Sequence, residues 1–425
     1  MADKPNVKLE KLVKVETEAK ICKDFYIGST NVLNETYLPK WTGETDAGYK
    51  TRIASTAFAN MFAPIIDGFA GMIMKKEPIV KGYNNTENID LKLNTLAGFI
   101  KETIKKSISE GAVFVSVETS KELNRAYFKT YPYENLYSYY VENGILKQLV
   151  FIEYVEVKDG DFGIKTEERF VVFKIGGGEV WYISNGQKEI SKQDTWANSL
   201  TEIPVLPIVT GKIQTDFEYI PKLLDIALLN KVHLNLESSL SNVLGVVGNP
   251  TPVFYGDIGE DKKTIGVKDA LVFTDKSKEG FEWVEIQGSS IGELKTKITG
   301  IEAQIDKLTF SMLLNSDSNT IIDAQEKQSK NTSFLSDVAH EAEEKFSKLL
   351  QYMMQLENAT IPNDAVFEMQ KEFDLSVISL DIAFKMLQSQ DMSRETFYTI
   401  MQTGKLPKDF DAQDEAGKIE ADIAQ

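Results

Sequence analysis

The chain has few residues suited to nucleophilic or acid–base catalysis. It contains one cysteine, Cys22, and two histidines, His233 and His340, beside 64 acidic residues in 425. With so many acids some carboxylate pairs always occur, and no pair here stands in a recognisable catalytic arrangement. The phosphate-binding pattern G-x-x-x-x-G-K-[ST] does not occur in the sequence. An enzyme, for example a hydrolase with paired carboxylates, is therefore a poorly supported function.

Three short patterns resemble known sites, but each has a simpler interpretation. Asp161-Phe162-Gly163 matches the magnesium-binding motif of kinases, yet no glycine-rich loop accompanies it, so a hairpin turn is favoured. The glycines at 176–178 stand between two predicted strands with no helix after them, which predicts a turn. His233 has only Glu237 at helical spacing, so a surface or interface histidine is favoured over a metal ligand. We predict no catalytic, cofactor-binding or metal-ligating residue.

Composition and charge indicate a globular protein that does not bind nucleic acid tightly. Hydrophobic residues make up 42% of the chain, and no run approaches the length of a membrane span. The first 23 residues form a charged arm without a signal peptide's apolar segment, and one cysteine fits a reducing cytoplasm. The net charge of −17 opposes tight phosphate binding. It would suit a passage through which DNA slides, and solubility alone explains it equally well.

Between Ala112 and Pro207 the hydrophobic residues alternate with a period of two, which predicts strands. Val113, Val115 and Val117 begin this pattern. Turns containing glycine separate the later runs, so we expect an antiparallel meander. The runs span residues 125–131, 145–157, 168–175 and 179–183, with turns at 142–144, 158–160 and 176–178.

Helical periodicity is predicted on both sides of this region. A helix over Ile53–Met74 should be kinked or divided by Pro64, and a helix over Leu91–Glu110 should end at Gly111. A third helix is predicted over Tyr219–Val247. Three short strands should follow it, at Pro252–Tyr255, Ala270–Phe273 and Phe281–Ile286.

The helix predicted from Ile291 to Leu313 has a narrow apolar stripe. Its members alternate three and four residues apart, as in a helix that packs on one or two others from its own or a neighbouring subunit. Ser290 and Glu293 have the spacing of a capping box. The stripe consists of Ile291, Leu294, Ile298, Ile301, Ile305 and Leu308.

A polar run interrupts the helical pattern after this stripe. Its short side chains compete with the backbone for hydrogen bonds, so a loop is predicted there. The pattern resumes from Ile321 to Met354 and predicts a helix of about ten turns. The loop consists of Asn315, Ser316, Asp317, Ser318, Asn319 and Thr320.

The order of these elements and several stretches of sequence carry a family resemblance. One stretch is FEWVEIQGSSIGELKTKITGIEAQIDKL, residues 281–308, placed between a small β-rich insert and a polar loop before a long helix. Others are YLPK at 37–40, YKTR at 49–52, and a helix running into KEP at 76–78. SRETFYTIMQTGKLPKDFD, residues 393–411, lies near the C-terminus. In this order they resemble the portal proteins of tailed bacteriophages, over residues 24–420.

The resemblance implies an α+β portal-type fold with an α/β wing, two stem helices flanking a β-rich clip, a long wing helix and a helical crown. In this sequence the parts would be an N-terminal arm (1–23), the wing (24–218), a stem helix (219–247), the clip (248–289), a stem helix (290–314), the tunnel loop (315–320), the long wing helix and following segment (321–374) and the crown (375–425).

The resemblance also implies a function in the virion, after assembly in the host cytoplasm. Identical subunits, typically twelve, would form a ring at one capsid vertex for genome packaging and ejection. Implied partners are the large terminase, a head-to-tail adaptor, a major capsid or scaffold protein, and double-stranded DNA that passes without tight binding. No cofactor and no membrane are implied. Another phage assembly component, such as an adaptor or scaffold-like protein, is the alternative.

Overall fold

The computed structural model of this chain combines helices with antiparallel sheets, in agreement with the predicted α+β class. It divides into two units, one of Met1–Thr309 with Val338–Met369 and one of Phe310–Asp337 with Gln370–Gln425. The structure describes residues 4–120, 122–184, 189–247, 251–255, 264–265, 268–269, 271–273, 280–284, 289–314, 334–359, 361, 367–371, 373, 392–403 and 412–423.

The N-terminal segment is part of the core of the first unit. Helix α1 (Glu10–Ile27) has apolar residues three or four apart that form one buried stripe. The prediction that residues 1–23 form a separate charged arm is therefore wrong, because residue 23 lies inside α1. Most of the charged residues of α1 cover the face of the helix that points away from the core. The stripe consists of Leu12, Val15, Ala19 and Cys22.

The helix predicted over Ile53–Met74 is divided, as Pro64 indicated, but its limits differ. Helix α3 (Asp46–Ser55) follows the short α2 (Ser29–Val32), and α4 (Phe62–Ile73) begins after residues 56–61. Pro64 is the third residue of α4, a position where its missing N–H has no partner within the helix. The break therefore lies before the proline.

Helix α5 (Leu96–Glu110) ends at Gly111 as predicted, with a φ of +85° at that glycine. It begins five residues later than predicted. Leu91 and Leu93 have φ values of +59° and +67°, so this stretch is a turn. The Thr95 side chain then accepts a hydrogen bond from the backbone N–H of Gly98 at 3.2 Å and caps the helix.

Two antiparallel sheets follow, and the predicted meander is confirmed. The first sheet has the order β3 (Arg125–Pro132), β2 (Ala112–Ser120), β9 (Val205–Val209). In the second, strands pair in chain order after a 3-10 turn at Tyr133–Asn135. They are β4 (Leu136–Glu142), β5 (Ile145–Asp159), β6 (Gly163–Lys174), β7 (Gly177–Ser184) and β8 (Glu189–Ala197); β10 (Lys212–Thr215) and β11 (Glu218–Ile220) form a separate hairpin.

Both sheets and α1 share one hydrophobic core. Phe114 of β2, Tyr131 of β3 and Phe151 of β5 are almost completely buried in it, beside Leu12 and Val15 of α1. The Tyr131 and Phe151 rings stack with centroids 4.6 Å apart. Aromatic burial of this kind fixes the sheets against each other.

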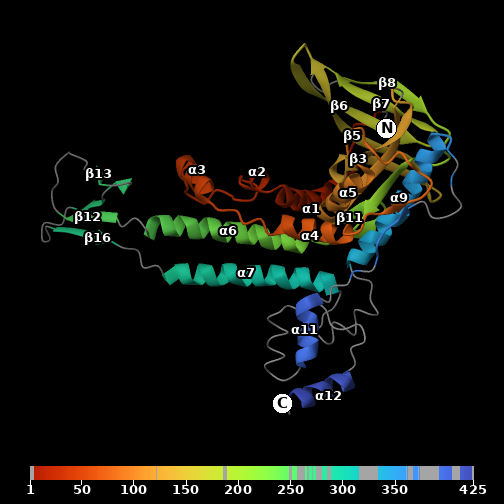
Figure 1. The fold of residues 1–425 in the computed structure, drawn as a ribbon. Coiled ribbons are helices and arrows are strands. Elements are labelled where there is room, and N and C mark those ends of the chain that lie inside the picture. Colours follow the sequence, from red (N-terminus) through yellow and green to blue (C-terminus); the bar gives the residue numbers. More distant parts are fainter. Residues whose placement is uncertain are drawn as a thin grey trace. The chain divides into compact units, whose positions relative to one another are not determined.

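Two long helices flank the small strands predicted between them (Figure 1). Helix α6 (Leu224–Val247) begins after the predicted Tyr219, because residues 218–220 pair as β11. Helix α7 (Ser289–Leu314) already includes Ser290, so the predicted capping box at that serine is wrong. The three predicted strands are confirmed as β12 (Thr251–Tyr255), β15 (Leu271–Phe273) and β16 (Gly280–Val284), with a short pair β13 (Thr264–Ile265) and β14 (Lys268–Asp269).

The predicted helix Ile321–Met354 is described from residue 334, as α9 (Phe334–Leu356). Residues 321–333, and the predicted loop at 315–320, lie outside the described residues. Strand β1 (Ile79–Val80) pairs with β17 (Phe367–Glu368). The second unit contains α11 (Arg394–Thr403) and α12 (Ala412–Ile423). Within the described part of the chain, no helix has the length and apolar character needed to cross a membrane.

Candidate functional site

Helices α6 and α7 lie side by side and antiparallel, as Figure 1 shows, and one polar contact fixes their register. His233 Nε2 of α6 lies 3.2 Å from Glu302 Oε1 of α7. Fourteen residues lead from His233 to Val247, and thirteen lead from Ser289 to Glu302. At the usual rise both stretches are about 20 Å long. The two helix ends that border the small strands are therefore level with each other.

The His233 side chain is only 1% exposed. It is therefore not a surface residue, and the alternative prediction of an interface histidine fits. Glu237 Oε1 lies 4.0 Å from its Nε2. Its Nδ1 is buried and has no hydrogen-bond partner among the described residues. In that same part of the chain, no three His, Cys, Asp or Glu side chains gather as a metal site would require. His233 and Glu302 therefore serve as a contact between helices.

The stripe of α7 is buried at its centre. Ile298 and Ile301 are 6% and 8% exposed and Ile305 is 1% exposed. Ile291, Leu294 and Leu308 are half-buried. The stripe therefore packs most closely near the His233–Glu302 contact, and less closely toward each end.

Ser290 lies in a Gly-x-Ser-x-Gly pattern at residues 288–292, which in α/β-hydrolases carries the nucleophile. It stands in the first turn of α7, twelve residues before Glu302. That spacing corresponds to about 18 Å along the helix axis. Because His233 contacts Glu302, it lies too far from Ser290 to act as its base.

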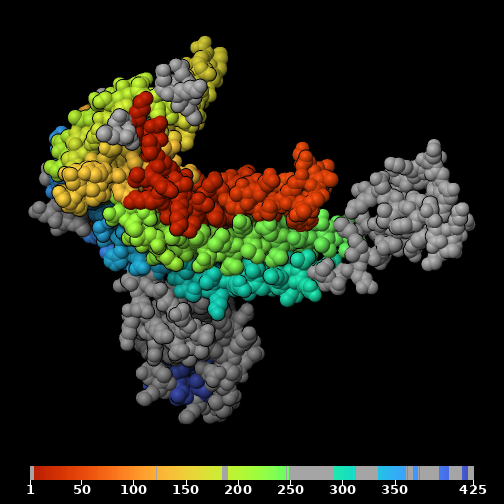
Figure 2. All heavy atoms as spheres, turned by 180° about the vertical axis from the view of Figure 1, so that it is seen from behind, coloured from red at the N-terminus to blue at the C-terminus, as the bar shows by residue number. Residues whose placement is uncertain are grey.

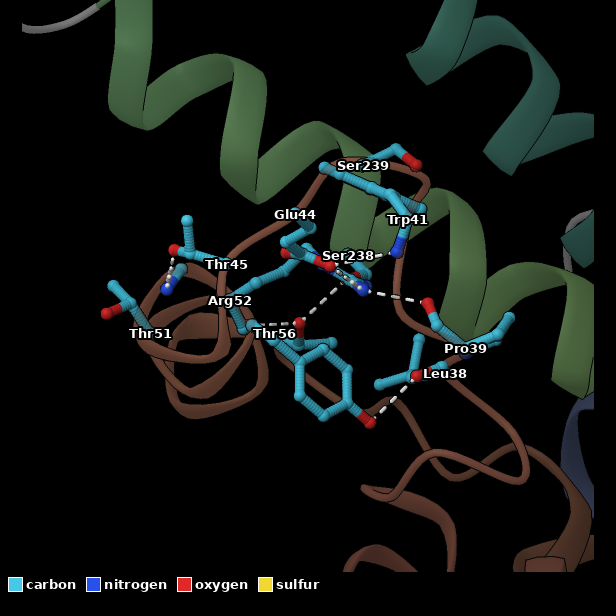
Figure 3. A network of polar contacts seen from close by, with 12 residues as sticks. Leu38, Pro39, Trp41, Glu44, Thr45, Thr51, Arg52, Thr56, Ser238 and Ser239 are labelled. Carbon is cyan, nitrogen blue, oxygen red and sulfur yellow. Dashed lines mark hydrogen bonds and ion pairs between the residues drawn. The ribbon is translucent and has the colours of Figure 1, made fainter.

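Arg52 of α3 joins the N-terminal segment to α6 (Figure 3). Its Nε and Nη2 donate to Glu44 Oε1 and Oε2 at 2.8 and 2.9 Å. Its Nη1 donates to Ser238 Oγ of α6 at 3.1 Å, and Nη2 also donates to the carbonyl of Pro39 at 2.9 Å. The guanidinium lies over the Trp41 ring, 4.1 Å from its centroid. One buried side chain thus connects a loop, a helix and the long helix α6.

The same arginine controls the charge of its partner. Its hydrogen bonds lower the pKa of the Glu44 carboxyl to about 2, so the pair is ionised at neutral pH. Thr56 Oγ1 donates to the Arg52 carbonyl at 2.7 Å and lies 3.0 Å from Ser238 Oγ, with which it shares a second hydrogen bond. Sequence reasoning missed this network. Only YKTR at 49–52 drew attention to Arg52, and no local pattern points to Ser238, which is 186 residues away.

Asn230 of α6 holds the start of α4. Its Oδ1 accepts from the backbone N–H groups of Met61 and Phe62 at 3.1 and 3.3 Å. Its Nδ2 donates to the carbonyl of Ala59 at 3.0 Å. The first N–H groups of a helix lack partners within it, and Met61 provides no side-chain cap. A side chain from α6 therefore replaces the missing cap. Asn235 of α6 also donates to the carbonyl of Tyr37 at 3.0 Å, so several polar contacts bind α6 to the N-terminal segment.

Comparison with known proteins gives a partial family match. Residues 222–356 match a family described as a domain of unknown function, DUF4055. That span includes α6, the small strands, α7 and α9. No curated protein matches the chain.

Among solved structures, two chains from phage-like particles are similar to this chain at low scores. A chain from the "Neck of empty GTA particle computed with C6 symmetry" has 10% identity and a TM-score of 0.40, over 84% of this chain and 93% of that chain. A chain from the "Virion of native gene transfer agent (GTA) particle" has 11% identity and a TM-score of 0.39, over 86% and 95%. At these scores the likeness does not decide a function.

Proposed function

We propose that the chain is the portal subunit of a phage-like particle. Identical copies would form a ring, typically of twelve in portal proteins, at one capsid vertex, through which the genome is packaged and ejected. The observation that carries the proposal is the antiparallel pair of helices α6 and α7, whose register is fixed by the contact between His233 and Glu302. A small β segment is inserted between the two helix ends that lie level with each other. Portal proteins, which the sequence resembles, place a clip between two stem helices in this way.

In this proposal α6 and α7 are the stem. Burial of Ile298, Ile301 and Ile305 holds the two helices against the rest of the subunit. Leu228 and Val232 of α6 are 38% and 42% exposed and lie one turn apart, on one face. That face is the part of the stem that a neighbouring subunit would cover in a ring.

The strands β12 to β16 would form the clip, where the large terminase and the head-to-tail adaptor dock. The β12, β15 and β16 strands make a sheet of only three, and short sheets of this kind need partners to be stable. The chain itself would catalyse nothing. Energy for DNA movement would come from the terminase, a separate ATPase.

The channel wall would be acidic and would not hold DNA. The net charge is −17, and the predicted tunnel loop Asn315–Thr320 carries one acid and no base. A loop of this composition contacts a polyanion without neutralising its phosphates. The subunit would also contact the major capsid or scaffold protein and would be found in the virion.

Electron microscopy of the purified chain tests this proposal against the adaptor and scaffold alternative. A portal should appear as rings with a central hole, and native mass spectrometry should give one closed multiple of the 47.7 kDa subunit. The helix pair supplies a matched control, because Ile301→Asp places a charge in the buried stripe and should abolish the rings. Particles without a hole, or a stable monomer at high concentration, would reject the portal function.

A further inference from the structure

Strands β5 and β6 continue beyond their sheet as a two-stranded ribbon. β4 pairs with β5 only as far as Phe151, and β7 pairs with β6 only from Arg169. Residues 154–159 and 163–168 pair with each other alone. Six residues of strand reach roughly 20 Å. Figure 2 shows this yellow segment standing out from the surface of the first unit.

The tip of the ribbon carries both apolar and acidic side chains. Phe162 is fully exposed, at 102% of its reference area, and Ile164 is 72% exposed. Asp159 and Asp161 beside them form no ion pair with a described residue. A lone two-stranded ribbon is marginally stable in water, and a fully exposed aromatic side chain at its end is unusual. The tip therefore has the character of an anchor for another surface.

A matching hollow lies at the base of the ribbon. It has a volume of about 280 Å³ and lies between α5, β3 and the first residues of the ribbon. Its aromatic lining residues are Phe99, Phe128, Tyr131 and Tyr154. Lys92, Lys106 and Lys129 stand in its wall with the acids Asp90 and Glu153, and Lys129 pairs with Glu153. A cavity of about 150 Å³ is enough to bind benzene, so the volume of the hollow would admit one phenyl ring. Phe99, Phe128 and Tyr131 are themselves 5%, 0% and 1% exposed. Neither Lys92 nor Lys106 pairs with an acid among the described residues.

We propose that the ribbon tip of one copy inserts Phe162 into this hollow on the next copy. Asp159 and Asp161 would then meet Lys92 and Lys106, which carry the opposite charge. The tip cannot reach the hollow of its own chain, because Tyr154 lines that hollow and the ribbon leads away from it. The contact joins two different patches and repeats head to tail, which closes into a ring when the rotation allows. It rests on the proposed ring and adds a second contact, outside α6 and α7.

Disulfide trapping tests the contact directly. The only native cysteine, Cys22, is completely buried, so Cys22→Ser gives a clean background. Phe162→Cys and Lys92→Cys variants, co-produced with different tags, should form a mixed disulfide dimer after mild oxidation. Ile213→Cys, also exposed at 68%, replaces Phe162→Cys as the control and should give none. No mixed dimer, or an equal yield with the control, overturns the proposal.

Truncation and charge exchange provide a second measurement. Phe162→Ala should weaken self-association about tenfold or more, as loss of a buried anchor does. Asp159→Lys with Asp161→Lys should also weaken it, and adding Lys92→Glu with Lys106→Glu in the same chain should restore it. Unchanged association of the Phe162→Ala variant counts against the contact, as does failure of the exchange to rescue. Rings that form without the mixed disulfide reject the ribbon contact and leave the portal function supported. A mixed disulfide in particles without a central hole supports the ribbon contact and rejects the portal function.

Discussion

Arg52 and Glu44 form a paired guanidinium–carboxylate contact, with Nε–Oε1 at 2.8 Å and Nη2–Oε2 at 2.9 Å. The same guanidinium reaches Ser238 of α6. The planar guanidinium donates hydrogen bonds in several fixed directions, so it can bind the Glu44 carboxylate and Ser238 at once. A lysine ammonium group cannot reproduce the paired contact with the carboxylate. Arg52 is therefore one of the residues that hold the N-terminal segment to the candidate stem, together with the Asn230 contacts to α4.

Replacing Arg52 tests this connection. Arg52→Lys keeps the charge but loses the paired geometry, so we expect a lower thermal midpoint by several degrees, and Arg52→Ala should lower it further because Glu44 is left unpaired. Lys40→Ala is the control, because its partner Asp46 is exposed and such pairs contribute little. Differential scanning fluorimetry measures all three. Equal midpoints for Arg52→Lys and wild type would show that charge alone suffices.

Glu110 at the end of α5 should make stability depend on pH. Burial raises the pKa of its carboxyl from 4.5 to about 7, although Tyr133 N–H donates to its Oε2 at 3.3 Å. Because the folded pKa lies above the unfolded one, its contribution is complete below pH 4.5 and is lost as pH rises through 7. The loss is roughly 3 kcal/mol.

Urea unfolding of Glu110→Gln at pH 5 and pH 8 checks this expectation. The variant lacks the titrating carboxyl, so its stability should fall less than that of the wild type between the two values. Glu102→Gln, an exposed change on the same helix, should behave as the wild type. The same pH dependence in Glu110→Gln would assign the effect to other groups.

Asn230→Ala removes the cap that α6 provides for α4. The backbone N–H groups of Met61 and Phe62 lose their acceptor, and Phe62 is fully buried. Leaving a buried donor unsatisfied costs about 1–3 kcal/mol. Denaturant unfolding should show this loss, and Asn242→Ala, exposed on the same helix, should not. A stable Asn230→Ala protein would mean that α4 finds another cap.

Ile305→Ala tests the stripe of α7. A fully buried isoleucine reduced to alanine typically costs about 2–5 kcal/mol, and Ile305 is 1% exposed. Ile291→Ala, a half-buried member of the same stripe, should cost clearly less. The thermal midpoint of each assembled ring provides the comparison. Equal costs would show that neighbouring subunits cover Ile291 as fully as the fold covers Ile305.

The predicted tunnel loop, residues 315–320, is tested by adding charge. Ser316→Arg with Ser318→Arg adds two positive charges per subunit, so a ring attracts the DNA backbone in a salt-dependent way. We expect normal rings that package or release DNA poorly, most severely at low salt, where screening is weakest. DNA per particle measures the effect. Normal packaging and ejection at low salt would place residues 315–320 away from the channel.

The sequence alone determined the local elements. Alternation with a period of two predicted the paired strands β5, β6 and β7, although not β4 or β8. Gly111 marked the end of α5 because a residue free to adopt a positive φ fits there. Spacing of three and four predicted the stripe that α7 buries at Ile298, Ile301 and Ile305. Such patterns are set by neighbours within one or two turns of chain, so they are visible without the fold.

Only the tertiary structure decided which distant groups meet. The charged sequence of α1 concealed a buried stripe, and His233 became an interior contact because Glu302, 69 residues later, lies on the antiparallel helix. Arg52 and Ser238 are 186 residues apart. A polar side chain is satisfied by whichever partner the fold brings within hydrogen-bond distance, and no local periodicity records that choice.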